Sequence, residues 1–177
     1  MHRLYEYGDI AVFWDSEKCR HAKRCVTGSP KTFDFQRRPW IDLTQAPTME
    51  IWQTIDKCPT KALTCVYTHE VTVELDMDNC RSVAYIAAGS VSEGNDASKP
   101  TAGSDNTPSG DNKEKIGECD FRRSGNEWII YHTEVSPEYG GKGIAKRLVY
   151  KLLEAAEREG VTVNPLCSYA AGVLSGE

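Results

Sequence analysis

The chain has 177 residues, a length that fits one domain or two small ones. Its composition, 40% hydrophobic and 27% charged, excludes an intrinsically disordered protein, and its net charge of −5 argues against nucleic acid as a partner. No apolar run approaches the ~18 residues of a membrane span, and the first residues lack the apolar stretch of a signal peptide, so we expect a cytoplasmic protein without a membrane partner.

The charge is distributed unevenly along the chain. Residues 1–68 hold 10 lysines and arginines against 8 acidic residues, a net charge of +2, whereas the remainder carries −7. A change of sign of this kind indicates two segments with separate roles.

Cysteine is the most informative residue type in the composition. The chain contains seven cysteines. They are Cys19, Cys25, Cys58, Cys65, Cys80, Cys119 and Cys167. Without a secretory signal a disulfide framework is not expected. The cysteines therefore point to metal binding or thiol chemistry.

The first half of the chain has three predicted elements. Residues 10–14 form a β-branched and aromatic run that predicts a strand, and residues 32–35 alternate as a short strand does. Thr48 can cap a short helix that ends before Pro59.

The middle of the chain contains two further strand candidates and a segment of different composition. Residues 71–75 alternate and predict a strand or a connector, and residues 82–86 predict a strand. Residues 87–114 are rich in Gly, Ser, Asp, Asn and Pro and have almost no large apolar side chains. We expect them to form a flexible loop, because they cannot bury enough apolar area to offset their ordering entropy.

The clearest patterns follow that segment. Residues 116–122 and 128–135 predict two strands joined by a turn at residues 124–126. Apolar residues at helical spacing predict a helix over residues 144–159, and Gly160 stands where a glycine ends a helix. Residues 161–163 predict a last strand.

The cysteines of the first half are spaced like the ligands of an iron–sulfur cluster. Bacterial ferredoxins use C-x2-C-x2-C with a Cys-Pro elsewhere. Here Cys19 and Cys25 match the first and third loop positions, Ala22 stands at the second, and Cys58 precedes Pro59. Three thiolates can hold a 3Fe-4S cluster, or a 4Fe-4S cluster whose last iron takes another ligand. His21 and Cys65 are the nearest candidates for that ligand. The alternatives are zinc, which usually needs four ligands in closely spaced pairs, and buried free cysteines.

Further motifs around these cysteines resemble a known family. Cys19 and Cys25, followed by an Arg-Pro-Trp-Ile run at 38–41 and a Cys-Pro-Thr-Lys-Ala-Leu run at 58–63, are similar to the divergent single-cluster 4Fe-4S family. The resemblance covers about residues 5–66. It implies a small ferredoxin-like fold whose cluster is held by Cys19, Cys25 and Cys58.

The cluster loop is also basic. Lys18, Arg20, Lys23 and Arg24 surround the two loop cysteines. The simplest interpretation is a solvated face. The functional interpretation is that these charges raise the reduction potential of a cluster or dock an acidic redox partner protein.

A glycine loop precedes the long predicted helix. Gly140, Gly141 and Gly143 let the backbone turn tightly, and free N–H groups at a helix start favour an anion such as a pyrophosphate. The loop is neither a Walker loop nor a G-x-G-x-x-G fingerprint. Taken alone, it does not identify the ligand.

The sequence around this loop resembles the GCN5-related N-acetyltransferases. His-Thr-Glu-Val at 132–135, Gly-Lys-Gly-Ile-Ala-Lys-Arg-Leu-Val at 141–149 and Pro-Leu-Cys at 165–167 look like the small YjdJ-type domains of that superfamily. The resemblance implies binding of acetyl-CoA and acetyl transfer to an amine acceptor whose identity the sequence does not give. The pyrophosphate contacts would come from Gly141, Lys142, Gly143, Ile144 and Ala145.

The resemblance and the strand pattern supply the catalytic candidates. Cys167 matches the cysteine of the Pro-Leu-Cys motif, where a thiol can take an acyl group or transfer a proton. The alternative for Cys167 is a small buried hydrophobe. His132 and Glu134 point the same way on a strand, so either is a candidate general base. Their alternative is a hydrogen-bonded strand histidine beside a surface glutamate.

We therefore predict an α+β fold with a ferredoxin-like iron–sulfur domain followed by an acetyltransferase-like mixed α/β domain. The predicted limits are residues 1–68, a connector at 69–76, and residues 77–177 with the flexible insertion at 87–114. The expected function is an iron–sulfur protein with an acetyl-CoA-binding domain that transfers acetyl groups. The alternative is a non-enzymatic electron carrier or redox sensor whose second domain only binds coenzyme A or is structural.

Overall fold

The structure, a computed structural model, describes residues 2–87 and 113–175. Its strands form two sheets, one in the order β1-β2-β3 and the other in the order β4-β5-β6-β7-β8. The strands are β1 (His2–Tyr7), β2 (Ile10–Asp15), β3 (Leu63–Tyr67), β4 (Thr72–Asp76), β5 (Arg81–Ala87), β6 (Lys113–Ser124), β7 (Glu127–Val135) and β8 (Thr162–Pro165). The helices are α1 (Arg24–Gly28), α2 (Thr48–Asp56), α3 (Ile144–Glu159) and α4 (Ser168–Ser175), with 3-10 turns η1 (Leu43–Gln45) and η2 (Pro137–Tyr139). The mixed α+β class is confirmed.

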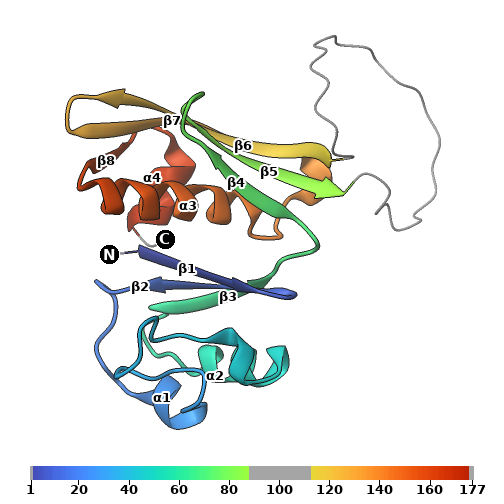
Figure 1. The fold of residues 1–177 in the computed structure, drawn as a ribbon, viewed down its shortest axis with the longest axis vertical. Helices are drawn as coiled ribbons and strands as arrows, with labels where there is room; N and C mark the ends of the chain where they lie inside the picture. Colours follow the sequence, from blue (N-terminus) through green and yellow to red (C-terminus); the bar gives the residue numbers. More distant parts are fainter. Residues whose placement is uncertain (1, 88–112, 176–177) are drawn as a thin grey trace, which may run out of the picture.

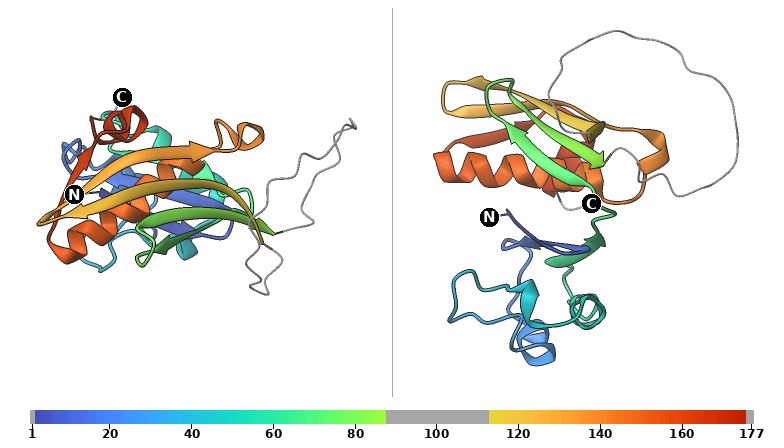
Figure 2. Two further views of the ribbon diagram at one scale, coloured as in Figure 1. Left: turned by 90° about the horizontal axis from the view of Figure 1, so that it is seen from above. Right: turned by 45° about the vertical axis from the view of Figure 1, so that its right-hand side comes forward.

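The long helix α3 lies between the two sheets, and α1 and α2 lie at the far side of the smaller sheet (Figures 1 and 2). In the larger sheet all neighbours are antiparallel except β7 and β8, which are parallel and flank α3 in sequence. The chain crosses from one sheet to the other between Tyr67 and Thr72. The cysteines of the predicted cluster and the glycine loop therefore belong to different layers of the molecule.

Strand β2 is buried on both faces, which explains its continuous apolar run. Ile10 and Val12 belong to the core cluster that contains the side chains of α2, whereas Ala11 and Phe13 belong to the cluster around α3. Alternate residues of a strand point to opposite faces, so this one strand contributes to both cores. The predicted strand at 10–14 is confirmed.

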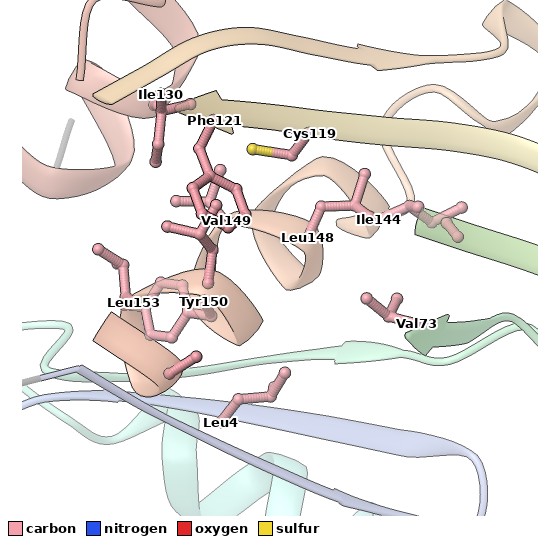
Figure 3. Close-up of a cluster of buried hydrophobic side chains, with 14 of the residues drawn as sticks. Leu4, Val73, Cys119, Phe121, Ile130, Ile144, Leu148, Val149, Tyr150 and Leu153 are labelled. Atoms are coloured by element: carbon pink, nitrogen blue, oxygen red, sulfur yellow. The ribbon is translucent and has the colours of Figure 1, made fainter. Parts of the chain in front are cut away.

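Helix α3 joins the two halves through a shared core. Its side chains pack against Phe121 and Ile130 of the larger sheet and extend toward Leu4 of β1 (Figure 3). The rings of Phe13 and Tyr150 meet edge to face with centroids 4.8 Å apart. The core around α3 thus contains residues from both predicted domains, and the division between them stays a prediction.

The predicted limits of α3 are confirmed. Gly143 precedes the helix with φ 74° and Gly160 ends it with φ 68°, both in the left-handed region that glycine adopts without strain. Residues 72–76 form β4 at the edge of the larger sheet, which confirms the strand alternative that the alternation predicts for residues 71–75. The predicted flexible insertion was too long at both ends, because residue 87 belongs to β5 and residues 113–114 to β6, where the two strands pair. Residues 88–112 lie outside the described residues.

Two local predictions were wrong. Residues 32–35 form only an isolated bridge between Phe33 and Ile41, because the carboxylate of Asp34 accepts a hydrogen bond from the N–H of Gln36 and turns the chain. Thr48 is the first residue of α2 rather than its cap. Its hydroxyl donates instead to the carboxylate of Asp9 at 2.6 Å.

Strands β1 and β3 were missed because their apolar residues do not alternate cleanly with polar ones.

Within the part of the chain that the structure describes, no helix is long and apolar enough to cross a membrane.

Candidate functional site

Three cysteines line one pocket in the smaller half, two from the segment after β2 and one from the segment after α2. Cys19 follows β2, Cys25 lies in the short helix α1, and Cys58 follows α2. The loop reaches this arrangement through backbone in the left-handed region at His21 (φ 52°) and Lys23 (φ 60°). The three predicted ligands are therefore gathered at one place.

The inner wall of the pocket is apolar. Phe35 and Trp40 stack with ring centroids 5.2 Å apart, and Leu63 completes the inner wall. Trp40 and Leu63 are buried. A wall of this kind limits solvent access, which is one of the factors that set the potential of an iron–sulfur cluster.

The thiols influence one another electrostatically. Burial raises the pKa of Cys25, and the neighbouring thiolates of Cys19 and Cys58 raise it further. Burial also raises the pKa of Cys58, but hydrogen bonds from the backbone of Leu63 and Thr60 outweigh burial and leave the pKa of Cys58 below its usual value. The N–H donors that stabilise a thiolate here are the kind that stabilise cluster sulfurs. The donor set therefore fits a cluster held by cysteine.

The structure separates the two candidates for a fourth ligand. His21 lines the pocket together with the three cysteines, whereas Cys65 does not. Cys65 lies on β3 and packs against the smaller core, and burial, followed by the charge of Asp56, raises its pKa to about 12. Over residues 2–87 and 113–175, no group of three or more His, Cys, Asp or Glu side chains is placed to hold a single metal ion.

The glycine loop leads directly into α3. Gly141 (φ 75°) and Gly143 (φ 74°) adopt left-handed backbone, and no side chain caps the helix. The first intrahelical hydrogen bond runs from the N–H of Arg147 to the carbonyl of Gly143. The N–H groups before Arg147 therefore have no partner within the helix, and the helix start is suited to an anion.

The loop also packs against the other half of the molecule, which the sequence did not indicate. A Cβ atom at Gly143 would lie 2.6 Å from a methyl carbon of Val66 on β3. One turn later, the ammonium of Lys146 donates to the hydroxyl of Thr64 at 2.8 Å. Gly143 is thus required by this close approach as well as by its backbone conformation.

Cys167 stands immediately before α4, and its carbonyl accepts the N–H of Ala171. Burial raises the pKa of Cys167, but hydrogen bonds from the backbone of Ala170 and the side chain of Thr133 outweigh burial and leave its pKa below the usual value. A thiol with a lowered pKa at a helix start is typical of reactive cysteines.

Thr133 is the residue that sequence reasoning missed at this site. Its hydroxyl lies between two thiols and has one proton to donate to either of them, since the thiol of Cys119 is also within hydrogen-bonding distance at 3.4 Å. Cys119 is buried, and burial raises its pKa to about 12. The one sequence feature that indicates this position is the alternation of β7, which places Thr133 on the inward face of the strand.

His132 and Glu134 lie on the opposite face of β7. The imidazole Nε2 and the carboxylate Oε2 are 3.2 Å apart, and both side chains are exposed. Pairing with β6 skips one residue at Tyr131, so a bulge lies just before His132. Thr133, which contacts Cys167, and its neighbour His132 face opposite sides of β7, because adjacent strand residues alternate. His132 and Cys167 therefore do not form one catalytic pair.

The lowered pKa of Cys167 leads to a prediction on its reactivity. We expect iodoacetamide to alkylate Cys167 with a half-maximal rate at a lower pH than a cysteine whose pKa is not lowered by hydrogen bonds. Thr133→Val should shift this profile to higher pH, because the thiolate loses a donor. Mass spectrometry of the Cys167 peptide over a pH series measures both, with buried Cys119 as the unreactive reference. Identical profiles for the wild type and Thr133→Val would exclude the role assigned to Thr133.

Comparisons with known proteins match two parts of the chain to known families. Residues 5–68 match the family described as divergent 4Fe-4S mono-cluster, and residues 107–176 match the family described as GCN5-related N-acetyl-transferase. The molecule is thus a single-cluster iron–sulfur domain joined to an acetyltransferase-like domain.

The relatives cover the first of these parts. The uncharacterized protein YjdI of Escherichia coli strain K12 is 34% identical over 62 residues, which are 35% of this chain and 82% of the relative. The protein of the same description from strain O157:H7 matches to the same extent. The chain belongs to the divergent single-cluster 4Fe-4S family, and its residues 107–176 are similar to the GCN5-related N-acetyl-transferases.

Proposed function

We propose that the protein binds one iron–sulfur cluster through Cys19, Cys25 and Cys58, binds acetyl-CoA at the start of α3, and transfers its acetyl group to an amine. The observation that carries the cluster assignment is the convergence of three cysteines from two separate segments on one pocket. Iron and sulfide analysis of protein purified without oxygen tests that assignment.

The residues of the pocket have distinct roles in this proposal. The three thiolates hold the cluster, and the backbone donors around Cys58 stabilise the charge on its sulfur. His21 is the candidate for the remaining iron of a 4Fe-4S cluster, since it lines the same pocket, and a 3Fe-4S cluster would need no such ligand. A bound cluster would supply one-electron chemistry.

The second half would hold the coenzyme and carry the transfer. Backbone N–H groups of Gly141, Lys142, Gly143, Ile144 and Ala145 would bind the pyrophosphate of acetyl-CoA. The thiolate of Cys167 would attack the thioester carbonyl, forming a new sulfur–acyl bond while coenzyme A leaves as a thiol after taking up a proton. An amine would then displace Cys167 and give up a proton. His132 and Glu134 lie on the opposite face of β7, so in this scheme they would not be the base for the amine that attacks the acyl group on Cys167.

A second function has support from the charge around the cluster pocket. Arg20, Lys23 and Arg24 line this pocket and are exposed. A basic surface beside a redox centre favours docking of an acidic partner protein. In that case the protein is an electron carrier or redox sensor whose second half binds coenzyme A without turnover. A protein that binds acetyl-CoA but acetylates no member of an amine panel would support this second function.

Gly141→Asp is expected to weaken the affinity for coenzyme A at least about tenfold. A Cβ atom at Gly141 meets no atom within 4 Å, so the new carboxylate fits sterically and repels a pyrophosphate at the helix start. Isothermal titration with coenzyme A measures the change. Gly143 is less suitable, because its substitution also disturbs the packing against Val66.

Gly125→Asp is the matched control for this variant. Gly125 also has positive φ and open space around it, but it lies in the turn between β6 and β7. Both variants carry the same backbone strain and added charge, so only Gly141→Asp should lose affinity. Equal affinities in the two variants would show that the loop does not bind the coenzyme.

A further inference from the structure

A cavity of about 500 Å³ lies between the cluster half and the acetyltransferase half. Its walls come from the end of β2, the segments beside Cys19 and Cys58, the first turns of α3, and α4. None of the five loop residues assigned to the coenzyme pyrophosphate lines it. The volume falls within the range of about 300–1,000 Å³ that is usual for small-molecule sites.

Three lysines from three separate segments line this cavity. Lys18 precedes Cys19, Lys61 follows Cys58 by three residues, and Lys146 lies in the first turn of α3. Asp15 is the one carboxylate in the lining. Its oxygens already accept the N–H of Glu17 at 2.9 Å and lie 3.8 Å from the imidazole of His2. The lining therefore carries an excess of positive charge.

Lys146 is half-buried and is held by neutral groups. Its ammonium donates to the hydroxyl of Thr64 and lies 4.6 Å from the ring centroid of Phe13 and 5.6 Å from that of Tyr150. Among the described residues, no carboxylate lies within ion-pairing distance of Lys61 or Lys146. Burial, and after it the charge of Lys18, lowers the pKa of Lys146. A bound anion would offset this cost of burying a cation.

The arrangement suits a phosphate group better than a single carboxylate. Ammonium groups approach from three segments, and the hydroxyls of Thr64, Tyr150 and Ser168 add donors to the same lining. A phosphate offers three or more acceptor oxygens and a charge near −2, which matches the excess of two positive charges. We propose that this cavity is a phosphate-binding site built jointly by the two halves, with Lys61 and Lys146 among its ligands.

The phosphate can come from two sources, which a titration distinguishes. One source is the 3′-phosphate of coenzyme A, and the other is a free phosphate group such as inorganic phosphate. Holoprotein purified without oxygen is titrated with inorganic phosphate, coenzyme A and dephospho-coenzyme A. The variants are Lys61→Gln and Lys146→Gln. Lys57→Gln serves as the control, because Lys57 is exposed, adjoins Cys58 and does not line the cavity.

We expect each cavity variant to weaken binding of at least one phosphate probe about tenfold or more, with unchanged affinity in Lys57→Gln. If the cavity takes the 3′-phosphate, Lys61→Gln binds coenzyme A only as tightly as it binds dephospho-coenzyme A. Its affinity for dephospho-coenzyme A equals that of the wild type. If it takes a free phosphate, only binding of inorganic phosphate is lost.

The proposal is overturned if wild-type protein binds none of the probes, or if the cavity variants bind them all as the wild type does. It does not depend on the glycine loop. Gly141→Asp should weaken binding of coenzyme A and dephospho-coenzyme A alike, so failure of the coenzyme site is distinguishable from failure of this one.

Discussion

Cys58→Ser is expected to lower the iron content of protein purified without oxygen at least about tenfold. Loss of a residue that merely supports a metal ligand already costs about 10–100-fold in metal affinity, and loss of a ligand costs more. Cys58 is also the thiol whose surrounding N–H groups stabilise its thiolate, and a serine hydroxyl at this position would stay protonated. Iron and sulfide analysis with a visible spectrum measures the loss, and EPR of the wild type identifies the cluster as 3Fe-4S or 4Fe-4S.

Cys80→Ser is the matched control, because Cys80 is also half-buried but lies in the larger half, away from the cluster pocket. It should retain the iron of the wild type. Cys65→Ser and His21→Ala extend the comparison to the fourth ligand. We expect Cys65→Ser to keep its iron, since Cys65 does not line the pocket. Full iron content in Cys58→Ser would contradict the ligand assignment.

The gathering of three cysteines at one pocket was predictable from their spacing along the chain. Cys19 and Cys25 share one loop, and Cys58 is marked by the proline that follows it. Helix α3 was predictable for a similar reason, since its apolar spacing and Gly160 define it locally. Features of this kind depend on neighbouring residues, whose pattern is visible in the sequence.

The contacts between the halves could not be predicted from the sequence. Lys146 and Thr64 are 82 residues apart, and neither residue type at its position indicates a partner. The glycine at 143 suggested a ligand, yet the structure shows that Val66 also approaches it closely. Likewise, the sequence of β1 does not indicate that this strand packs against α3, because Leu4 is the one buried residue in it. Long-range packing of this kind depends on the shapes of surfaces that a single sequence does not reveal.

The contacts of Arg147 show most clearly how α3 ties the halves together. Its guanidinium donates to the carboxylate of Glu6 at 2.7 Å, and to the carbonyls of Thr68 at 3.2 Å and Val71 at 2.7 Å. Residues 68–71 are the segment in which the chain crosses from one sheet to the other. Arg147 is 3% exposed, so these carbonyls have no access to water at that point. The arginine therefore fixes both the crossing segment and the position of β1.

Arg147→Met is expected to lower the free energy of unfolding by about 2–6 kcal/mol, because it leaves two buried carbonyls without a donor at a cost of about 1–3 kcal/mol each. The methionine fills much of the space but leaves the two carbonyls without a donor, whereas Glu6 keeps its ion pair with Lys151 at 2.8 Å. The corresponding fall in melting temperature is roughly 10 °C for a chain of this length. Urea unfolding followed by tryptophan fluorescence measures the change.

Arg81→Met is the control that separates burial from loss of an arginine. Arg81 also pairs with two carboxylates, those of Glu118 and Asp120, but its side chain is 39% exposed. Because water reaches the side chain of Arg81 and screens its charge, Arg81→Met should lower stability less than Arg147→Met. Equal losses in the two variants would mean that Arg147 acts as an ordinary surface charge. A loss of stability in Arg147→Met alone would show that the buried contacts of α3 with the crossing segment and β1 stabilise the junction between the two halves.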